Sequence, residues 1–384
     1  MLSRPAAESA LLPVYAQMPV RPVSGSGSWI TDDQGQRWLD AYGGHAVSST
    51  GHSHPHVVAA IAKQAAQLLF YSTVLPHPNR ERLAELLVAR MPAPLSGVFF
   101  ANSGAEANEN ALHLARKVTG RQRVVSIEGG WHGRTLGCLA VTDGEKYMAS
   151  ARRAGVQLSA KVPFNDVAAL DRLLGDDVAA LIVEPVQGMM GARDCSVEFL
   201  ERAREVTAER GVLMIFDEIQ CGVGRSGHFT AAESFGVTPD LLTMAKGLGS
   251  GMPISATIAS SAIASQVAIG DLGSTFGGGP VPCAAAIATL EVIDEEALLE
   301  NVTRVSDHIV AGAASIGVPQ VQGRGLLLGL RLERPAAQVQ RAMFERRALT
   351  GTSTDPAVLR LMPPLSFSLD EADLLLDSLR EVLA

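Results

Sequence analysis

The sequence has few aromatic residues, no excess of positive charge and no long apolar run. Aromatic side chains make up 5% of its 384 residues, which disfavours a protein that stacks nucleic-acid bases. The formal net charge of −8 would repel a phosphate backbone. No apolar run approaches the roughly 18–20 residues of a membrane-spanning helix. We therefore expect no nucleic-acid partner and no membrane partner.

Cysteine pairs and an export signal are also missing. The four cysteines, Cys138, Cys195, Cys221 and Cys283, include no CxxC pair. The N-terminal segment carries Glu8 and Pro13, where a signal peptide needs an unbroken apolar core. These features predict a cytoplasmic protein, because unpaired thiols persist in a reducing compartment.

What the sequence does contain favours a large α/β protein. Hydrophobic residues make up 47% of the chain and charged residues 19%, which excludes a disordered chain. From about residue 56, strand and helix patterns alternate. We expect a large domain at 51–290 with a mostly parallel sheet covered by helices, because its short apolar runs do not alternate with polar residues. A small α+β domain is expected from both chain ends, 1–50 and 291–384.

The pattern of apolar residues predicts individual elements. Helices are expected at 57–69, 80–91, 103–120 and from 369 to the end, with a helical region after Pro282. Strands are expected at 98–101, 123–128, 138–142, 180–185, 212–218, 241–247 and 326–332. In an open parallel sheet, ligands bind beyond the carboxyl ends of the strands, so residues that follow a strand are candidates for chemistry.

Two candidates for binding follow predicted strands. Gly104 and Ala105 would begin a helix, and a helix N-terminus with a glycine is a favourable anion site, although an ordinary capped helix is the alternative. The segment WHGRT places Trp131 where it could stack on a flat cofactor. Arg134 of the same segment could hold a carboxylate through two hydrogen bonds.

Two candidates for catalysis close predicted strands. Asp217 would be costly to bury without a cation, such as a protonated cofactor nitrogen, a metal or an arginine. Lys246 is one of only five lysines in the chain. A buried lysine has a lowered pKa and can act as a nucleophile, whereas an arginine cannot.

Two further motifs suggest other chemistry, but their surroundings do not fit it. The segment GVGRSG (222–227) has the glycine spacing of a dinucleotide site, but it does not directly follow a strand as such a site requires. The segment GHSHPH (51–56) contains three histidines without a nearby cysteine or carboxylate, so a turn into a helix is expected there and no metal site.

Together, the four candidates match what pyridoxal 5'-phosphate requires. Such a cofactor needs a phosphate site, an aromatic plate, an acid at its ring nitrogen and a lysine for its aldehyde. At this level the sequence resembles the class III pyridoxal-phosphate aminotransferases of fold type I, and acetylornithine and ornithine aminotransferases most of all. The resemblance rests on SGAEANENALHLAR, WHGRT, EPVQG, DEIQCGVGRSG, AKGLGSGMP, STFGGGP and LRLMPPL.

The resemblance implies a role for each matching residue. Lys246 corresponds to the Schiff-base lysine and Asp217 to the partner of the ring nitrogen. For the rest of the cofactor, the matching residues are Gln220 at the phenolic oxygen, Trp131 on the ring, and Gly104 and Ala105 at the phosphate. Thr275 would reach the phosphate from a neighbouring subunit, which implies a homodimer with shared sites. Arg134 and Arg360 match arginines that bind substrate carboxylates, with Ser274 near the first.

Two departures from the family pattern concern the substrate. Met189 replaces the usual glutamate that would pair with Arg360 when an ω-amino donor is bound. His45, a predicted substrate-binding residue, stands where ornithine enzymes have a tyrosine and acetylornithine enzymes a small apolar residue. The expected activity is transfer of an amino group from an acetylornithine-like or ornithine-like amino acid to a keto acid, with 2-oxoglutarate as the expected acceptor. The alternatives are an aminotransferase for another amino acid, an aminomutase or racemase of the same fold, and a nicotinamide oxidoreductase using GVGRSG.

Overall fold

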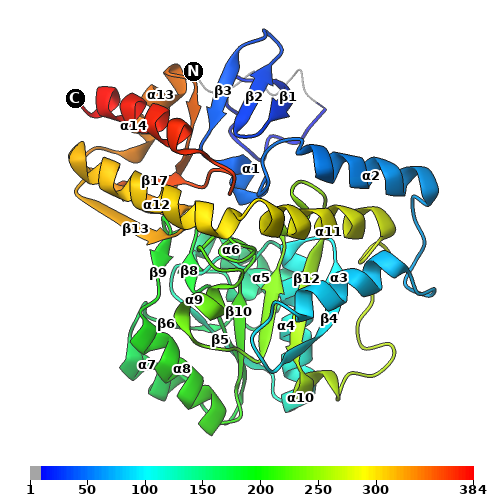
Figure 1. Ribbon diagram of the computed structural model, residues 1–384. Coiled ribbons are helices and arrows are strands. Elements are labelled where there is room, and N and C mark those ends of the chain that lie inside the picture. Colours follow the sequence, from blue (N-terminus) through cyan, green and yellow to red (C-terminus); the bar gives the residue numbers. More distant parts are fainter. Residues whose placement is uncertain (1–9) are drawn as a thin grey trace.

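The computed structural model describes residues 10–384, and a seven-stranded sheet lies in its larger part (Figure 1). The strands follow the spatial order β4-β12-β11-β10-β7-β5-β6. Their bounds are β4 (Leu95–Ala101), β5 (Arg123–Ile127), β6 (Ala160–Val162), β7 (Val178–Val183), β10 (Leu213–Asp217), β11 (Leu241–Met244) and β12 (Ser255–Ser260). Neighbours from β6 to β11 pair in parallel, and only β12 runs antiparallel to its two neighbours. The predicted mostly parallel sheet is confirmed.

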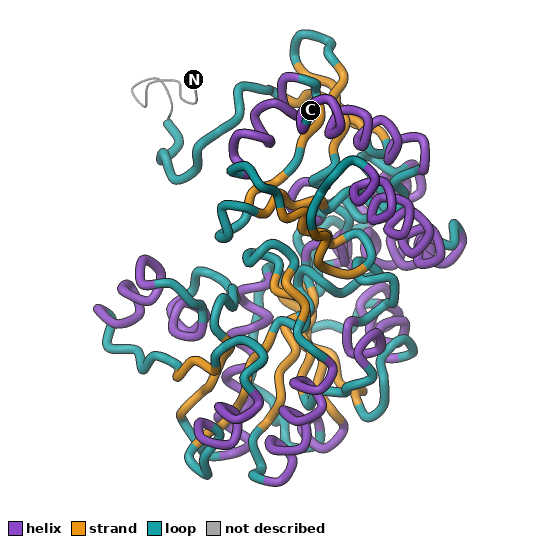
Figure 2. The backbone as a smooth tube through the Cα atoms, turned by 90° about the vertical axis from the view of Figure 1, so that its left-hand side faces the viewer, coloured by secondary structure: helices purple, strands orange, loops and turns teal. Residues whose placement is uncertain are grey.

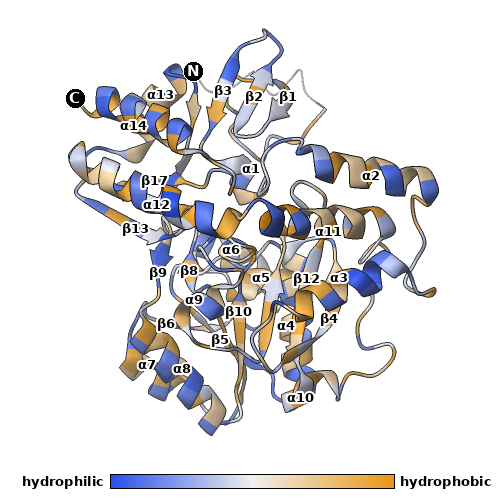
Figure 3. Ribbon diagram, viewed as in Figure 1, coloured by the Kyte–Doolittle hydropathy of each residue, from blue (hydrophilic) through white to orange (hydrophobic). Residues whose placement is uncertain are grey.

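Helices cover both faces of this sheet, as the view along its edge shows (Figure 2). They include α4 (Gly104–Thr119), α5 (Leu136–Val141), α6 (Glu145–Arg153), α7 (Val167–Leu173), α8 (Val197–Glu209), α9 (Ala231–Phe235) and α10 (Ser261–Ala264). Every residue of β7 is buried. Strands covered on both faces have no polar face to show, which explains the continuous apolar runs of the sequence. Figure 3 shows the same pattern, with hydrophobic strands such as β10 inside helices of mixed character.

The two ends of the chain meet in the upper part of Figure 1. β1 (Pro22–Ser26), β2 (Trp29–Asp32) and β3 (Arg37–Asp40) form a sheet with β15 (Ala348–Leu349), which pairs in parallel with β3. A second sheet contains β13 (Gln320–Arg324), β14 (Leu327–Arg331), β16 (Gly351–Thr352) and β17 (Val358–Leu361), beside α13 (Ala336–Glu345) and α14 (Leu369–Leu383). The first nine residues of the predicted 1–50 segment lie outside the described residues.

Long helices connect the two parts. α11 (Pro280–Glu295) and α12 (Leu298–Ser315) run between them in Figure 1. The remaining elements are α1 (Gly43–Ala46), α2 (Pro55–Gln67), α3 (Pro78–Val88), β8 (Val186–Gln187), β9 (Arg193–Asp194) and the short 3-10 helix η2 (Lys246–Gly249). Within residues 10–384, no helix combines the length and apolar character needed to cross a bilayer.

One predicted strand is wrong. Residues 138–142 were expected as a strand, but most of this segment belongs to helix α5. The sequence CLAVT is a short apolar run, and such a run does not distinguish a buried helix from a buried strand. Here the segment packs on α4, where Cys138 Sγ donates to Ala105 O at 3.3 Å. The expected strand at 241–247 is also shorter, because η2 begins at Lys246.

The motifs GVGRSG and GHSHPH have structural roles. In GVGRSG, Arg225 is buried and donates hydrogen bonds to the backbone carbonyls of Leu326 and Pro363. This motif therefore connects the loop after β10 to the C-terminal segment of the chain through hydrogen bonds. In GHSHPH, His54 caps α2 and Pro55 begins it, which confirms the predicted turn into a helix.

Candidate active site

A cavity of about 560 Å³ opens at the carboxyl edge of the large sheet. This volume suits a small-molecule site. Eight of the eleven residues predicted from the sequence line it: His45, Gly104, Ala105, Trp131, Arg134, Asp217, Gln220 and Lys246. Ser274, Thr275 and Arg360 are not among the lining residues. The strand ends β10 and β11 thus bring Asp217 and Lys246 together, as parallel neighbours must.

Lys246 offers a free amine to this cavity. It follows β11 and begins η2 with a left-handed backbone, at φ 43°. Its Nζ makes no hydrogen bond with any residue in the described part of the chain. Burial lowers the pKa of Lys246, while the Asp217 carboxylate acts in the opposite direction. An unpaired amine with a lowered pKa is suited to nucleophilic and proton-transfer chemistry.

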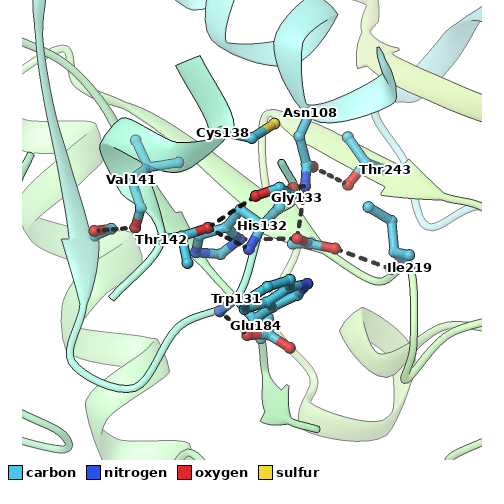
Figure 4. Close-up of polar contacts among 12 residues, drawn as sticks. Asn108, Trp131, His132, Gly133, Cys138, Val141, Thr142, Glu184, Ile219 and Thr243 are labelled. Carbon is cyan, nitrogen blue, oxygen red and sulfur yellow. Dashed lines mark hydrogen bonds and ion pairs between the residues drawn. The ribbon is translucent and has the colours of Figure 1, made fainter. Parts of the chain in front are cut away.

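Asp217 closes β10 and is held by three hydrogen bonds. Figure 4 labels the three residues that donate them, Asn108, His132 and Ile219. Its Oδ2 accepts from Asn108 Nδ2 at 2.7 Å and from His132 Nδ1 at 2.8 Å. Its Oδ1 accepts from the backbone N–H of Ile219 at 3.1 Å. His132 Nδ1 donates in this contact, and its Nε2 has no partner among residues 10–384. These three donors fix the orientation of the Asp217 carboxyl group at the cavity.

Asn108, His132 and Thr243 were missed in the sequence. Thr243 Oγ1 donates to Asn108 Oδ1 at 2.8 Å, and Asn108 Nδ2 also donates to the carbonyl of His132 at 2.8 Å. All three side chains are buried. The available signals were an asparagine at helical spacing from the apolar residues Ala111 and Leu112 and a histidine beside Trp131, because buried polar groups need partners.

The start of α4 forms an anion cradle. Ser103 caps the helix by accepting from Glu106 N at 3.3 Å. The backbone N–H groups of Gly104 and Ala105 donate to none of the described residues. A Cβ at position 104 would meet Ile219 at 2.7 Å, so only glycine allows this approach. Free N–H groups at the start of a long helix favour a phosphate.

Aromatic rings surround Arg134 at the mouth of the cavity. The rings of Trp131 and Tyr147 meet edge to face, with centroids 4.7 Å apart. The Arg134 guanidinium lies 5.2 Å from the Trp131 ring, 5.6 Å from Tyr147 and 6.0 Å from Tyr15. Arg134 has no ion pair or hydrogen bond within residues 10–384, so its N–H groups are free for a ligand. Tyr15 and Tyr147 were not predicted, since only folding brings them to Arg134.

Glu184 and Gln220 occupy the inner wall. Gly188 lies so close to Gln220 that a Cβ there would overlap the side-chain amide. Glu184 Oε1 accepts from the backbone N–H of Trp131 at 2.6 Å. Burial and the nearby Asp217 raise the pKa of Glu184 to about 8. With a pKa near 8, Glu184 is mostly protonated at neutral pH.

The second predicted arginine lies behind the cavity wall. Arg360 is buried, and it donates to Thr352 O at 2.7 Å, Gly188 O at 3.1 Å and Tyr42 Oη at 2.9 Å. All three acceptors are uncharged. Nearby, the ring of His45 meets that of Tyr42 edge to face at 4.5 Å, and His45 has a left-handed backbone at φ 70°. Burial, with the cations Arg360 and Lys246, lowers the pKa of His45, so its imidazole is neutral.

Ser274 and Thr275 lie in the loop before α11. Ser274 Oγ accepts from Asn102 Nδ2 at 3.3 Å, and Asn102 is itself a lining residue. Thr275 is exposed to solvent. Neither reaches the cavity of its own chain, so a role for Thr275 at the phosphate requires a second chain.

The residues present fit pyridoxal phosphate. The unpaired N–H groups of the α4 cradle suit its phosphate, and Trp131 presents a flat ring to its pyridine. Asp217 offers a fixed negative charge for a protonated ring nitrogen, and Lys246 offers an amine for the aldehyde.

Comparison with known proteins agrees with this geometry. The family model for aminotransferase class III matches residues 13–383. An acetylornithine aminotransferase 1 of Bordetella bronchiseptica is 40% identical, with 95% of each chain covered. An acetylornithine aminotransferase of Methanothermobacter thermautotrophicus is 38% identical, covering 97% of this chain and 96% of the relative.

Solved structures are similar in fold. An ornithine aminotransferase from Toxoplasma gondii matches with a TM-score of 0.90 at 28% identity, covering 97% of this chain and 92% of the other. A second structure of that protein, with 29% identity and the same TM-score, is described with partial occupancy of pyridoxal phosphate at its active site. The extent of these matches assigns the chain to the class III aminotransferases, enzymes that transfer amino groups with pyridoxal 5'-phosphate.

Proposed function

We propose that this aminotransferase moves an amino group from an acetylornithine-like or ornithine-like donor to a keto acid, 2-oxoglutarate. The observation that carries the proposal is the unpaired amine of Lys246 in the same cavity as the fixed carboxylate of Asp217. The names of the relatives support the donor class. The free guanidinium of Arg134 supports substrates that carry a carboxylate.

In this proposal, the cofactor is held from several elements. Gly104 and Ala105 bind its phosphate, Trp131 stacks on its ring and Gln220 binds its phenolic oxygen. Asp217 keeps a proton on its ring nitrogen. When bound, pyridoxal phosphate supplies an aldehyde that takes up the amino group and a ring that accepts electrons.

Lys246 moves the proton. Its Nζ has a lowered pKa because of burial, so a larger fraction of the amine is unprotonated at neutral pH than in water. An unprotonated Nζ can take the proton from the donor carbon that bears the amine and return it afterwards. Arg134 meanwhile holds the donor's carboxylate, and His45, which also lines the cavity, contacts the far end of the donor.

We also propose that the protein is a cytoplasmic homodimer. In each chain, residues 51–290 form the large domain. Thr275, exposed in its own chain, would reach the phosphate of a second copy. The exposed apolar residues Leu69, Phe70, Ile269 and Phe276 support a covered surface near this loop. All four cysteines are buried thiols, which supports a reducing compartment.

A half-reaction screen tests the donor. The enzyme loaded with pyridoxal phosphate is mixed with ornithine, acetylornithine, lysine, 4-aminobutyrate or α-amino acids, and the near-visible absorption band is followed. We expect acetylornithine or ornithine to remove the band and 2-oxoglutarate to restore it. A band that no donor removes would contradict the proposed transfer, and a band that no keto acid restores would favour an amino shift within one substrate.

An Arg134→Lys variant should bind 2-oxoglutarate more weakly. A guanidinium binds a carboxylate through two charge-assisted hydrogen bonds, and a lysine cannot reproduce that geometry. A loss of about 1.5–3 kcal/mol corresponds to a roughly 10- to 100-fold rise in the dissociation constant. Titration of the half-reaction with 2-oxoglutarate measures it, with the exposed Arg82→Lys as a control. Wild-type affinity in Arg134→Lys would contradict the proposed binding of the substrate carboxylate by Arg134.

A Met189→Glu variant should shift donor preference. Met189 lines the cavity beside Gly188, whose carbonyl accepts from Arg360. Arg360 has no carboxylate in an ion pair within residues 10–384. Glu184 does not neutralise it, because the raised pKa of about 8 leaves Glu184 protonated. A persistent cation should raise kcat/KM for donors with a carboxylate close to the reacting amine relative to plain ω-amino donors, without excluding the ω-amino donors.

The measurement is the ratio of kcat/KM for an α-amino donor to that for an ω-amino donor. A glutamate at 189 would give Arg360 an acidic partner, so the ratio should fall relative to the wild type. Met189→Gln has the same size without the charge and should keep the wild-type ratio. An identical ratio in Met189→Glu and Met189→Gln would show that the missing glutamate has no consequence for the donor.

A further inference from the structure

A second lysine, Lys161, lies outside the candidate site and has no part in the proposed reaction. Lys161 is on β6, the edge strand of the large sheet, and it is partly buried. Its Nζ lies 2.7 Å from Ser126 Oγ, 2.9 Å from Ser159 Oγ, 2.6 Å from Val141 O and 3.1 Å from Thr142 O. Every one of these acceptors is uncharged. Burial lowers the pKa of Lys161 to about 8.

The acceptors explain why an ammonium occupies this place. Val141 and Thr142 end helix α5, and the last carbonyls of a helix carry partial negative charge without an intrahelical partner. The hydroxyls of Ser126 and Ser159 lie 2.8 Å apart and also donate to α5 carbonyls. The Lys161 amine and the two serine hydroxyls therefore donate hydrogen bonds to the last carbonyl groups of α5. Burying an amine without a carboxylate partner costs free energy, and the four neutral acceptors around Lys161 Nζ offset part of that cost.

The end of α5 is connected to Asp217 by hydrogen bonds (Figure 4). Thr142, whose carbonyl binds Lys161, has its Oγ1 3.0 Å from the backbone N–H of His132, which donates to it. His132 Nδ1 in turn donates to Asp217 Oδ2 at 2.8 Å. The segment held in this way begins with Trp131 and includes Arg134, just before α5 starts. Lys161 thus lies three contacts from the carboxylate of the site.

We propose that Lys161 is a positioning residue for amino transfer, because it fixes the end of α5 so that Thr142 holds His132 against Asp217. This inference rests on the proposed function, in which the orientation of Asp217 governs turnover. It does not require Lys161 to touch the substrate or the cofactor. The Asp143 carboxylate acts against the effect of burial on the pKa of Lys161, but it accepts from the backbone N–H groups of Gly129 and Gly144 and forms no ion pair with Lys161.

A Lys161→Met variant of the loaded enzyme tests this. Methionine keeps the length and apolar stem but removes the charge and the donors. We expect kcat to fall by about 10- to 100-fold, as for a small misplacement of a reacting group. KM for the donor should stay within about twofold. The visible circular-dichroism band of the bound cofactor should also change. Lys63→Met, which removes an exposed lysine on α2, should match the wild type in all three measurements.

Two further variants separate positioning from a loss of folding. Thr142→Val is nearly isosteric and interrupts the same path without touching the lysine, so its kcat should also fall. In a double-mutant cycle, Lys161→Met should add little to His132→Phe, because both act through one contact.

The outcomes distinguish the two proposals. Wild-type kcat in Lys161→Met or in Thr142→Val would overturn the positioning role, as would full additivity in the cycle. A wild-type enzyme that transfers no amino group from any donor would instead overturn the proposed function.

Discussion

A Lys246→Ala variant is expected to fold, bind pyridoxal phosphate without a covalent link and lose turnover. Removal of a general base lowers rates by about two to four decades, and loss of the nucleophile adds to this. Stability should be retained, because Lys246 Nζ has no hydrogen-bond partner in the described part of the chain to leave unpaired. Alanine also meets the same left-handed backbone as the lysine it replaces.

The measurement combines steady-state rates with borohydride treatment and peptide mass mapping. In the wild type, the reagent should attach the cofactor to the peptide containing Lys246, and in the variant it should attach none. Lys63→Ala removes an exposed lysine and should behave as the wild type. Normal turnover in Lys246→Ala would contradict the proposed role of Lys246 as the lysine that binds the cofactor and transfers the proton.

An Asp217→Asn variant should retain the cofactor but lose most of its activity. Breaking a buried charge pair of this kind costs about 3–5 kcal/mol, which is roughly two to four decades if it is expressed in the transition state. The amide also offers one acceptor in place of two, whereas Asp217 accepts from Asn108, His132 and Ile219. Part of the loss should therefore appear as lower thermal stability.

Rates and unfolding temperatures must be measured together to separate these effects. Asp294→Asn changes an exposed acid that pairs with Arg90 and serves as the matched control. If Asp217→Asn loses stability but keeps its kcat, Asp217 is a structural acid only. If kcat falls while most of the protein remains folded, the charge itself acts in the reaction.

Much of the fold follows from local patterns. The helix expected at 103–120 is α4, capped by Ser103 and ended by Gly120 in a left-handed conformation at φ 68°. The strand ends at Asp217 and Lys246 were predictable, because buried strands are short apolar runs followed by a polar residue. The segment at 138–142 was wrong for the same reason, since an apolar run of that length also suits a short buried helix such as α5.

The candidate site divides in the same way. Sequence motifs alone identified Lys246, Asp217, Trp131 and Arg134, because each follows a strand or stands within a motif of fixed spacing. The partners of these residues come from far along the chain. Asn108 is 109 positions from Asp217, and Tyr15 approaches Arg134 from the N-terminal segment. No local pattern encodes such contacts.

The sequence by itself determined the family and the class of cofactor, and it predicted most of the residues that line the cavity, since these depend on residue types at set spacings. The tertiary structure alone decided the hydrogen-bond partners and the protonation of the buried ionisable groups. It places His132 and Asn108 on Asp217, leaves Glu184 protonated by burial and surrounds Arg360 with uncharged acceptors. Charge state and orientation depend on burial and on hydrogen bonds between distant segments, and only the packed chain supplies both.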